Sequence, residues 1–131
     1  MKPPPQLKTG IWIDALIRRA HAGGAFAVLS RRGDRDAGSV LVGVRSADGL
    51  SLYAPEREMD GRRIWRAQRT DASGLASTIA SRADFDPDLN VVEIDDAQGR
   101  HFIEEPVLDS EECREDAAVA AAAARALFRD R

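Results

Sequence analysis

Apolar side chains recur at helical spacing near the start of the chain. Within residues 9–22 they share one side of a helix: Trp12, Ile13, Leu16, Ile17 and Ala20. Three or four residues separate neighbouring turns of a helix, so this spacing predicts an amphipathic helix with one apolar face. Glycine is common directly after a helix, and Gly23 with Gly24 predicts its end.

Short apolar runs between glycine-containing turns predict three strands, at residues 25–31, 39–45 and 50–54. Antiparallel pairing of the first two strands about Arg35 places six side chains on one face: Phe26, Val28, Ser30, Val40, Val42 and Val44. A three-residue turn at 47–49 then sets Leu52 across from Val44 and Ala54 across from Val42. The pattern predicts an antiparallel meander with one buried face, which the first helix covers.

The second half of the chain predicts further strands and helices. Residues 62–69 read as an edge strand, or a strand with an exposed face. Ser73 is the predicted N-cap of a short helix that carries Leu75, Ile79 and Ala83. A strand at residues 89–95 is followed by a turn and a short return strand at 100–103. Residues 110–129, rich in alanine, predict a last helix.

These elements together predict an α+β fold. The expected architecture is an antiparallel sheet of about five strands covered on one face by two helices, plus a C-terminal Ala-rich helix. A chain of 131 residues fits one domain. We expect a flexible Pro-rich arm at residues 1–7, a single α+β domain at 8–105 and a helical extension at 106–131.

Composition narrows the function classes. The net charge of −3 disfavours a protein that coats nucleic acid generically, although 17 of the 19 basic residues are arginine. A single cysteine, Cys113, excludes a disulfide framework within the monomer and a multi-cysteine zinc site. The sequence has no apolar run of about 20 residues and no apolar leader after Met1, so we expect a cytoplasmic protein without membrane contact.

Several spaced segments carry a family resemblance. They are the Trp12 helix, residues 31–38, Arg63-Ile64-Trp65, residues 86–96 and residues 99–102. Together they resemble the alphaproteobacterial domain of unknown function numbered 1491, over about residues 8–105. Asn90 departs from this pattern, because an aromatic residue is expected there. The resemblance implies a small cytoplasmic bacterial protein of unassigned activity, and it brings no catalytic residues.

Acidic residues and histidines are the candidate metal-binding or catalytic groups. Asp34 and Asp36 resemble half of a calcium loop, but the closing glutamate is absent and a tight turn explains them. His21 and His101 lack the spacing of a metal-ligand pair. We therefore predict no metal and no cofactor. The carboxylates around the last hairpin fit a charged outer strand face; the enzyme alternative is a small hydrolase that uses His101 with Asp95 or Asp96.

Arginines and aromatic residues supply the remaining candidate site. Cys113 has no activating base near it in sequence, and no catalytic residues are predicted. Ile64 and Trp65 are consecutive in their strand, so their side chains point to opposite faces of the sheet. If Ile64 is buried, Trp65 is therefore expected to be exposed. The predicted binding residues share that outer face: Tyr53, Arg63, Trp65 and Arg69.

Such a face favours a non-enzymatic binding or adaptor module with a protein partner, because Trp, Tyr and Arg are frequent interface anchors. Nucleic-acid binding through a local arginine patch is the alternative. The pattern leaves the oligomeric state open, with a dimer as one alternative.

Overall fold

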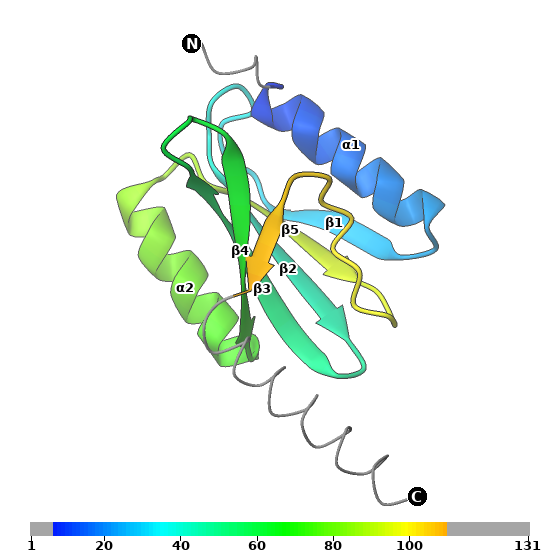
Figure 1. Ribbon diagram of the computed structural model, residues 1–131. Coiled ribbons are helices and arrows are strands. Elements are labelled where there is room, and N and C mark those ends of the chain that lie inside the picture. Colours follow the sequence, from blue (N-terminus) through cyan, green and yellow to red (C-terminus); the bar gives the residue numbers. More distant parts are fainter. Residues whose placement is uncertain (1–6, 110–131) are drawn as a thin grey trace, which may run out of the picture.

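The computed structural model describes residues 7–109, which form two helices and six strands (Figure 1). In chain order the elements are α1 (Thr9–Ala22), β1 (Phe26–Arg31), β2 (Val40–Ser46), β3 (Gly49–Arg57), β4 (Arg63–Thr70), α2 (Ala72–Phe85), β5 (Asn90–Asp95) and β6 (Val107–Asp109). The α+β class and both helices are confirmed. The helix predicted for residues 110–129 and the arm at residues 1–6 lie outside the described residues.

The sheet is mixed, with the strand order β1-β5-β2-β3-β4-β6. β5 pairs antiparallel with β1 but parallel with β2, and β6 pairs parallel with β4. The prediction of an antiparallel sheet of about five strands is therefore wrong in strand direction. The predicted hairpin between residues 25–31 and 39–45 is wrong too, because β5 lies between these strands. α2 is the crossover that brings the chain from β4 back to β5 in the parallel direction.

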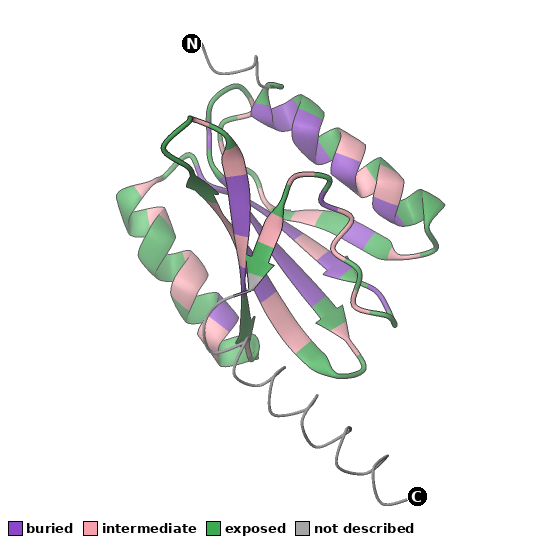
Figure 2. Cartoon of the chain, in the orientation of Figure 1, coloured by how far each residue is buried: buried purple, intermediate pink, exposed green. Residues whose placement is uncertain are grey.

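The two helices cover opposite faces of the sheet, so the prediction that they share one face is wrong. α1 packs over one apolar cluster, whose strand residues include Val40, Val42, Val44, Val92 and Ile94. α2 covers the other face, where Leu75 contacts a second cluster formed by Leu41, Leu52, Leu89 and Val91. Figure 2 shows the result: the central strands are largely buried, whereas most of α2 is exposed or intermediate.

The register between β2 and β3 decides which side of β3 faces α1. Val42 pairs with Tyr53, and Ser46 pairs with Gly49, so the connecting turn has two residues instead of the predicted three. A shift of one residue exchanges the two faces of a strand. Tyr53 consequently joins the cluster under α1, and Leu52 joins the cluster under α2.

Asn90 fixes the loop between β1 and β2. Its side chain is fully buried; Oδ1 accepts a hydrogen bond from Gly33 N at 2.7 Å, and Nδ2 donates to Asp34 O at 2.9 Å. The departure from an aromatic residue at position 90 is thus explained by four polar contacts to loop backbone. A Cβ on Gly33 would lie 1.9 Å from Asp88 O, so the loop passes the β5 entrance where only glycine fits.

Residues 96–106 cross from β5 to β6 over the α1 side of the sheet, where Phe102 and Ile103 join the α1 cluster. The predicted return strand at 100–103 is wrong, because this segment has no strand pairing and β6 forms later. Phe102 adopts a φ of 60°, which is the left-handed region, so the crossover bends sharply there. Within residues 7–109, neither helix is long and apolar enough to cross a membrane.

Candidate functional site

Two tryptophans from distant segments stack inside the α1 cluster. The rings of Trp12 on α1 and Trp65 on β4 have centroids 5.0 Å apart and planes 14° apart. Both indole N–H groups donate to the same atom, Oε1 of Glu105, at 2.9 Å and 3.0 Å. A buried indole N–H needs an acceptor, and the crossover supplies one carboxylate for both rings.

Arg63 completes this cluster. Its guanidinium carbon lies 5.6 Å from the Trp12 ring centroid and 5.8 Å from the Trp65 ring centroid. Arg63 Nε is 3.7 Å from Glu105 Oε2, so both oxygens of that carboxylate are engaged. With a side chain only 17% exposed, Arg63 is held in one orientation by ring faces and a counter-charge.

The four predicted binding residues do not share an exposed face. Trp65 is 0% exposed and Tyr53 is 8% exposed, so the prediction that these rings face solvent is wrong. Both sides of β4 are buried here, which removes the parity argument that placed Trp65 outside opposite Ile64. Arg63 and Arg69 lie six residues apart on β4, about 20 Å by strand rise. Of the predicted set, Trp65 and Arg63 are brought together, whereas Arg69 lies at the other end of the strand.

A cleft of about 460 Å³ opens beside Arg63 at one end of the sheet. Its walls come from the chain before and at the start of α1, the loop into β2, the end of β3 and the start of β4 (Figure 1, top). The lining residues that matter for charge are Lys8, Asp36, Glu56, Arg57 and Arg63. Of these lining residues, only Arg63 is among the four predicted binding residues.

The loop that forms one wall is attached to the first turn of α1. Gly10 N donates to Arg35 O at 2.6 Å, and Thr9 Oγ1 donates to Gly38 O at 2.7 Å. The N-cap residue Lys8 has no side-chain cap, so the loop carbonyls satisfy helix donors that a cap would otherwise bind. Asp34 Oδ1 accepts from Asp36 N at 2.9 Å, a contact within the turn that supports the turn interpretation of this acidic pair.

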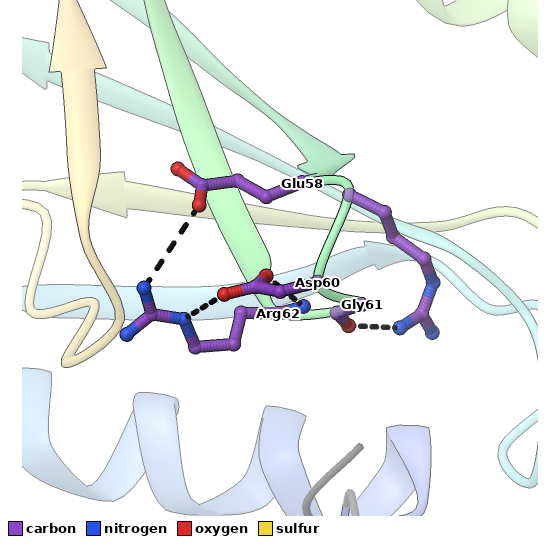
Figure 3. A network of polar contacts seen from close by, with 5 residues as sticks. Glu58, Asp60, Gly61 and Arg62 are labelled. Carbon is purple, nitrogen blue, oxygen red and sulfur yellow. Dashed lines mark hydrogen bonds and ion pairs between the residues drawn. The ribbon is translucent and has the colours of Figure 1, made fainter. Parts of the chain in front are cut away.

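The end of β3 and the start of β4 form the opposite wall, and the turn between them is cross-linked by polar contacts (Figure 3). Arg62 Nε donates to Asp60 Oδ2 at 2.8 Å, and the Arg62 guanidinium also lies 4.0 Å from Glu58. Arg57 Nη1 donates to Gly61 O at 3.0 Å, across the turn. These contacts fix the turn, and they pair the Arg62 guanidinium with carboxylates of the turn itself. Arg57, in contrast, lines the cleft.

The cleft contains three cationic and two anionic side chains. Asp36 lies near Lys8 and Glu56 near Arg66, and Arg63 lies near Glu105. Glu56 accepts from Arg66 at 2.9 Å and 3.1 Å, and these hydrogen bonds hold the pKa of the Glu56 carboxyl below its usual value. Asp36 lies 3.9 Å from Lys8. Leu7 is 59% exposed at the cleft and adds apolar surface to it. The arrangement suits a ligand that carries a negative charge beside an apolar group.

His101 and Asp96, which the hydrolase alternative would combine, each have other partners among the described residues. His101 stacks obliquely on Tyr53 with centroids 5.1 Å apart, and its Nδ1 accepts from Ile103 N at 2.9 Å. Burial lowers the pKa of His101. Asp96 instead binds Arg100 through both oxygens, at 2.9 Å and 3.0 Å, and this guanidinium lowers the pKa of Asp96. Among residues 7–109, no group of three or more metal-ligating side chains is present.

Sequence reasoning missed Trp12 and Glu105 as partners of Arg63. The helical spacing correctly predicts Trp12 on the apolar face of the first helix, whereas Glu105 is one of the carboxylates around the last hairpin that were expected on a charged outer strand face. The available signal was a pair of tryptophans in a chain with few aromatic residues, one of them two residues from Arg63. Their meeting depends on the crossover of residues 96–106, which local patterns do not encode.

The fold and cleft define a small α+β protein with a mixed six-stranded sheet and a charged cleft at one sheet end. A family model described as protein of unknown function, DUF1491, matches residues 7–104. The chain belongs to this family, as its resemblance predicted. No curated protein matches the chain.

Solved structures agree with this assignment. The crystal structure of a DUF1491 family protein from Caulobacter crescentus is 45% identical, covers 79% of this chain and 100% of that chain, and has a TM-score of 0.74. An NMR structure of a DUF1491 family protein from the same organism is 44% identical, with 78% and 96% coverage and a TM-score of 0.72. Protein Atu0922 from A. tumefaciens is 28% identical, with 81% and 98% coverage and a TM-score of 0.68.

Proposed function

We propose that this protein is a non-enzymatic binding module whose cleft beside Arg63 takes an acidic, partly apolar segment of a partner protein. The observation that carries the proposal is the fixed guanidinium of Arg63 at a cleft of about 460 Å³. An arginine that is already immobilised loses little conformational entropy when it binds an anion. The Trp12–Trp65 pair thus acts behind the binding surface rather than on it.

Charge favours a protein segment over nucleic acid. Lys8 and Arg57 flank the cleft with Arg63, but Asp36 and Glu56 lie there as well. A single carboxylate can approach the cationic groups and avoid these acids, whereas a run of phosphates meets both signs of charge. Several arginines elsewhere are bound to acids, including Arg35 with Asp14. The net charge of −3 points in the same direction.

The cytoplasmic location expected from the sequence belongs to this proposal, since a reducing compartment suits the single Cys113. The predicted division into an arm, a domain at residues 8–105 and an extension is carried forward in the same way. The cleft is lined by that domain except for Leu7, which belongs to the predicted arm.

The test is a selection of random peptides on the immobilised full chain, followed by affinity measurement of the enriched peptides. We expect enrichment of peptides with an acidic residue next to an apolar one. Arg57→Glu should weaken their binding at least about tenfold, because it reverses a charge in the cleft. Arg62→Glu is the matched control: it reverses a charge in the same hairpin, and Arg62 is paired at the turn with Asp60.

Three outcomes contradict the proposal. Enriched peptides without acidic residues would remove the charge argument. Equal affinities for the Arg57→Glu variant and the unaltered chain would place binding elsewhere. Tighter binding of a single-stranded oligonucleotide than of any selected peptide, lost in Arg57→Glu, would identify the cleft as a nucleic-acid site.

A further inference from the structure

Among residues 7–109, no element covers one part of the α2 face, next to the edge strand β1. Phe26 is 64% exposed and Val28 is 40% exposed, which is unusual for large apolar side chains at adjacent positions of one strand face. They border a hollow of about 200 Å³ that is also lined by Gly43 and Leu50. We call this surface the β1 patch: Phe26, Val28, Gly43, Arg45, Leu50, Glu93 and Asp95.

Strand register places the β1 patch on a single face and gives it an acidic side. Phe26 pairs with Asp95, and Val28 pairs with Glu93. Arg45 pairs with Asp95 on the other side of β5. The patch therefore offers apolar side chains beside two carboxylates and one guanidinium, which matches a basic apolar ligand by charge.

The edge of β1 is less available to a second copy of the sheet. His21 Nε2 lies 3.0 Å from Ala27 O and accepts from Ala27 N at 3.3 Å. These are backbone groups that an added strand would need for pairing. The imidazole thus obstructs strand addition at the middle of β1, while the face with Phe26 and Val28 stays open.

The chain itself contains a segment with the matching chemistry. After Asp109, where β6 ends, 22 residues follow. Their last seven residues combine two large apolar side chains with three arginines: Arg125, Leu127, Phe128, Arg129 and Arg131. The Caulobacter crescentus crystal structure is covered over 100% of its chain by 79% of this one, and the family model ends at residue 104. Residues 110–131 therefore lie outside the part of the chain that matches the family model.

The distance between Asp109 and the β1 patch is within reach of that segment. Five strand spacings separate β6 from β1 in the sheet, about 24 Å at about 4.8 Å each. The 18 residues from 110 to 127 span about 27 Å even at the short rise of a helix. Thr70 at the end of β4 pairs with Leu50, and Leu50 pairs with Arg45, so β6 points toward the sheet end that carries the patch.

We propose that residues 110–131 fold back over this end of the sheet and that Leu127 and Phe128 occupy the hollow of the β1 patch. The flanking arginines then lie near Glu93 and Asp95. The occupant of the patch is this chain's own C-terminal segment, which shields Phe26 and Val28 from solvent.

Paramagnetic labelling of the full chain tests this proposal. A nitroxide is placed at Asp130→Cys in a Cys113→Ser background, and amide peak intensities are compared with the reduced label. We expect strong loss of intensity at Phe26, Val28, Glu93 and Asp95. Adding Phe128→Ser should restore these peaks, and this substitution lies outside the described core, so the fold is retained.

A mixed sample separates the two remaining arrangements. In this sample, isotope-enriched chain without a nitroxide is mixed with nitroxide-carrying chain that has no isotope enrichment. Loss of peak intensity only in the first sample, where the nitroxide and the isotope label are on the same chain, supports intramolecular docking. Loss in the mixed sample, which indicates docking on a second copy, or no loss at the β1 patch in either sample, overturns the proposal.

Discussion

Glu105 shows how much one carboxylate contributes at the scale of single residues. One of its oxygens accepts from Trp12 and Trp65, and the other lies 3.7 Å from Arg63 Nε. The indole N–H groups are satisfied, and the guanidinium keeps a counter-charge next to the rings. Trp65 is thus a core residue whose removal affects both packing and the position of Arg63.

Trp65→Ala should lower the free energy of unfolding by about 3–5 kcal/mol, as truncation of a large buried ring does. Phe85→Ala is the control, because Phe85 is 90% exposed and its loss should change stability by less than about 0.5 kcal/mol. Urea denaturation of both variants is the measurement. Equal stabilities for the two variants would contradict the buried position of Trp65.

Gly33 and Gly43 differ sharply in the space around them. A Cβ on Gly33 would meet Asp88 O at 1.9 Å, whereas a Cβ on Gly43 would meet the Leu75 side chain at 3.4 Å. Gly33→Ala should therefore destabilise the protein by about 1–3 kcal/mol through a clash with backbone. Gly43→Ala should stay within about 0.5 kcal/mol. Thermal unfolding compares the pair, and a reversed order would contradict the path of the β1–β2 loop.

At the scale of elements, local patterns predicted most helices and strands but not their neighbours. The apolar run of β2, Val40 to Val44, is buried on both faces, which is typical of a strand with layers on each side. The sequence pattern predicts only one buried face for this strand, so the burial of its second face under α2 was not predicted. The β2–β3 turn is one residue shorter than predicted, and this shift places Tyr53 on the α1 face of the sheet and Leu52 on the α2 face.

Strand β5 illustrates why the rest escaped prediction. Its position between β1 and β2 results from pairings with residues 50 and 69 positions earlier in the chain, such as Asn90 with Val40 and Asp95 with Phe26. No short-range signal specifies such pairings. The same holds for the candidate site. The strand pattern predicts Arg63 as a binding residue, but no local pattern predicts that the 96–106 crossover places Glu105 beside it.

The N-cap of α2 distinguishes the sequence prediction from the structure. Asp71 is the N-cap, and its Oδ1 accepts from Gly74 N at 2.7 Å, whereas Ser73 was predicted for this role. Asp71→Ala should cost about 1 kcal/mol of unfolding free energy. Ser73→Ala should change the unfolding free energy by at most about 0.5 kcal/mol, because it removes no cap and alanine is the better helix former. Chemical denaturation that gives the larger loss for Ser73→Ala would contradict the observed helix start.

The 96–106 crossover predicts a dependence of stability on pH. Arg100 holds the pKa of Asp96 below its ordinary value of 3.8, so Asp96 stabilises the folded state above that pH. This contribution is lost as the pH falls through the lowered pKa of the folded state. Asp96→Asn should therefore be less stable than the unaltered chain at pH 7, and the difference should shrink below about pH 4.

Unfolding free energies measured between pH 2 and pH 7 check this expectation, with the exposed neighbour Asp95→Asn as the control. A difference between the Asp96→Asn variant and the unaltered chain that stays constant with pH would show that the Asp96–Arg100 contact does not act through charge.

At the scale of the whole molecule, the cleft depends on three regions that are distant in sequence, the last of them the β3–β4 hairpin. The start of α1, the loop into β2, the end of β3 and the start of β4 meet at one sheet end. The loop is attached to α1 by hydrogen bonds, and the β3–β4 turn is closed by Arg57 and Arg62. The two walls are therefore set before a ligand arrives, which favours binding of a short segment without rearrangement.

The most direct test of this account maps where a selected acidic peptide binds the full chain. Backbone amide shifts of isotope-labelled protein are recorded during titration with the peptide. The account predicts that the largest shifts fall on cleft residues, with Lys8, Ser39, Arg57 and Arg63 among them. Largest shifts at Phe26, Val28 and Glu93, or at the exposed Arg69 end of β4, would contradict it.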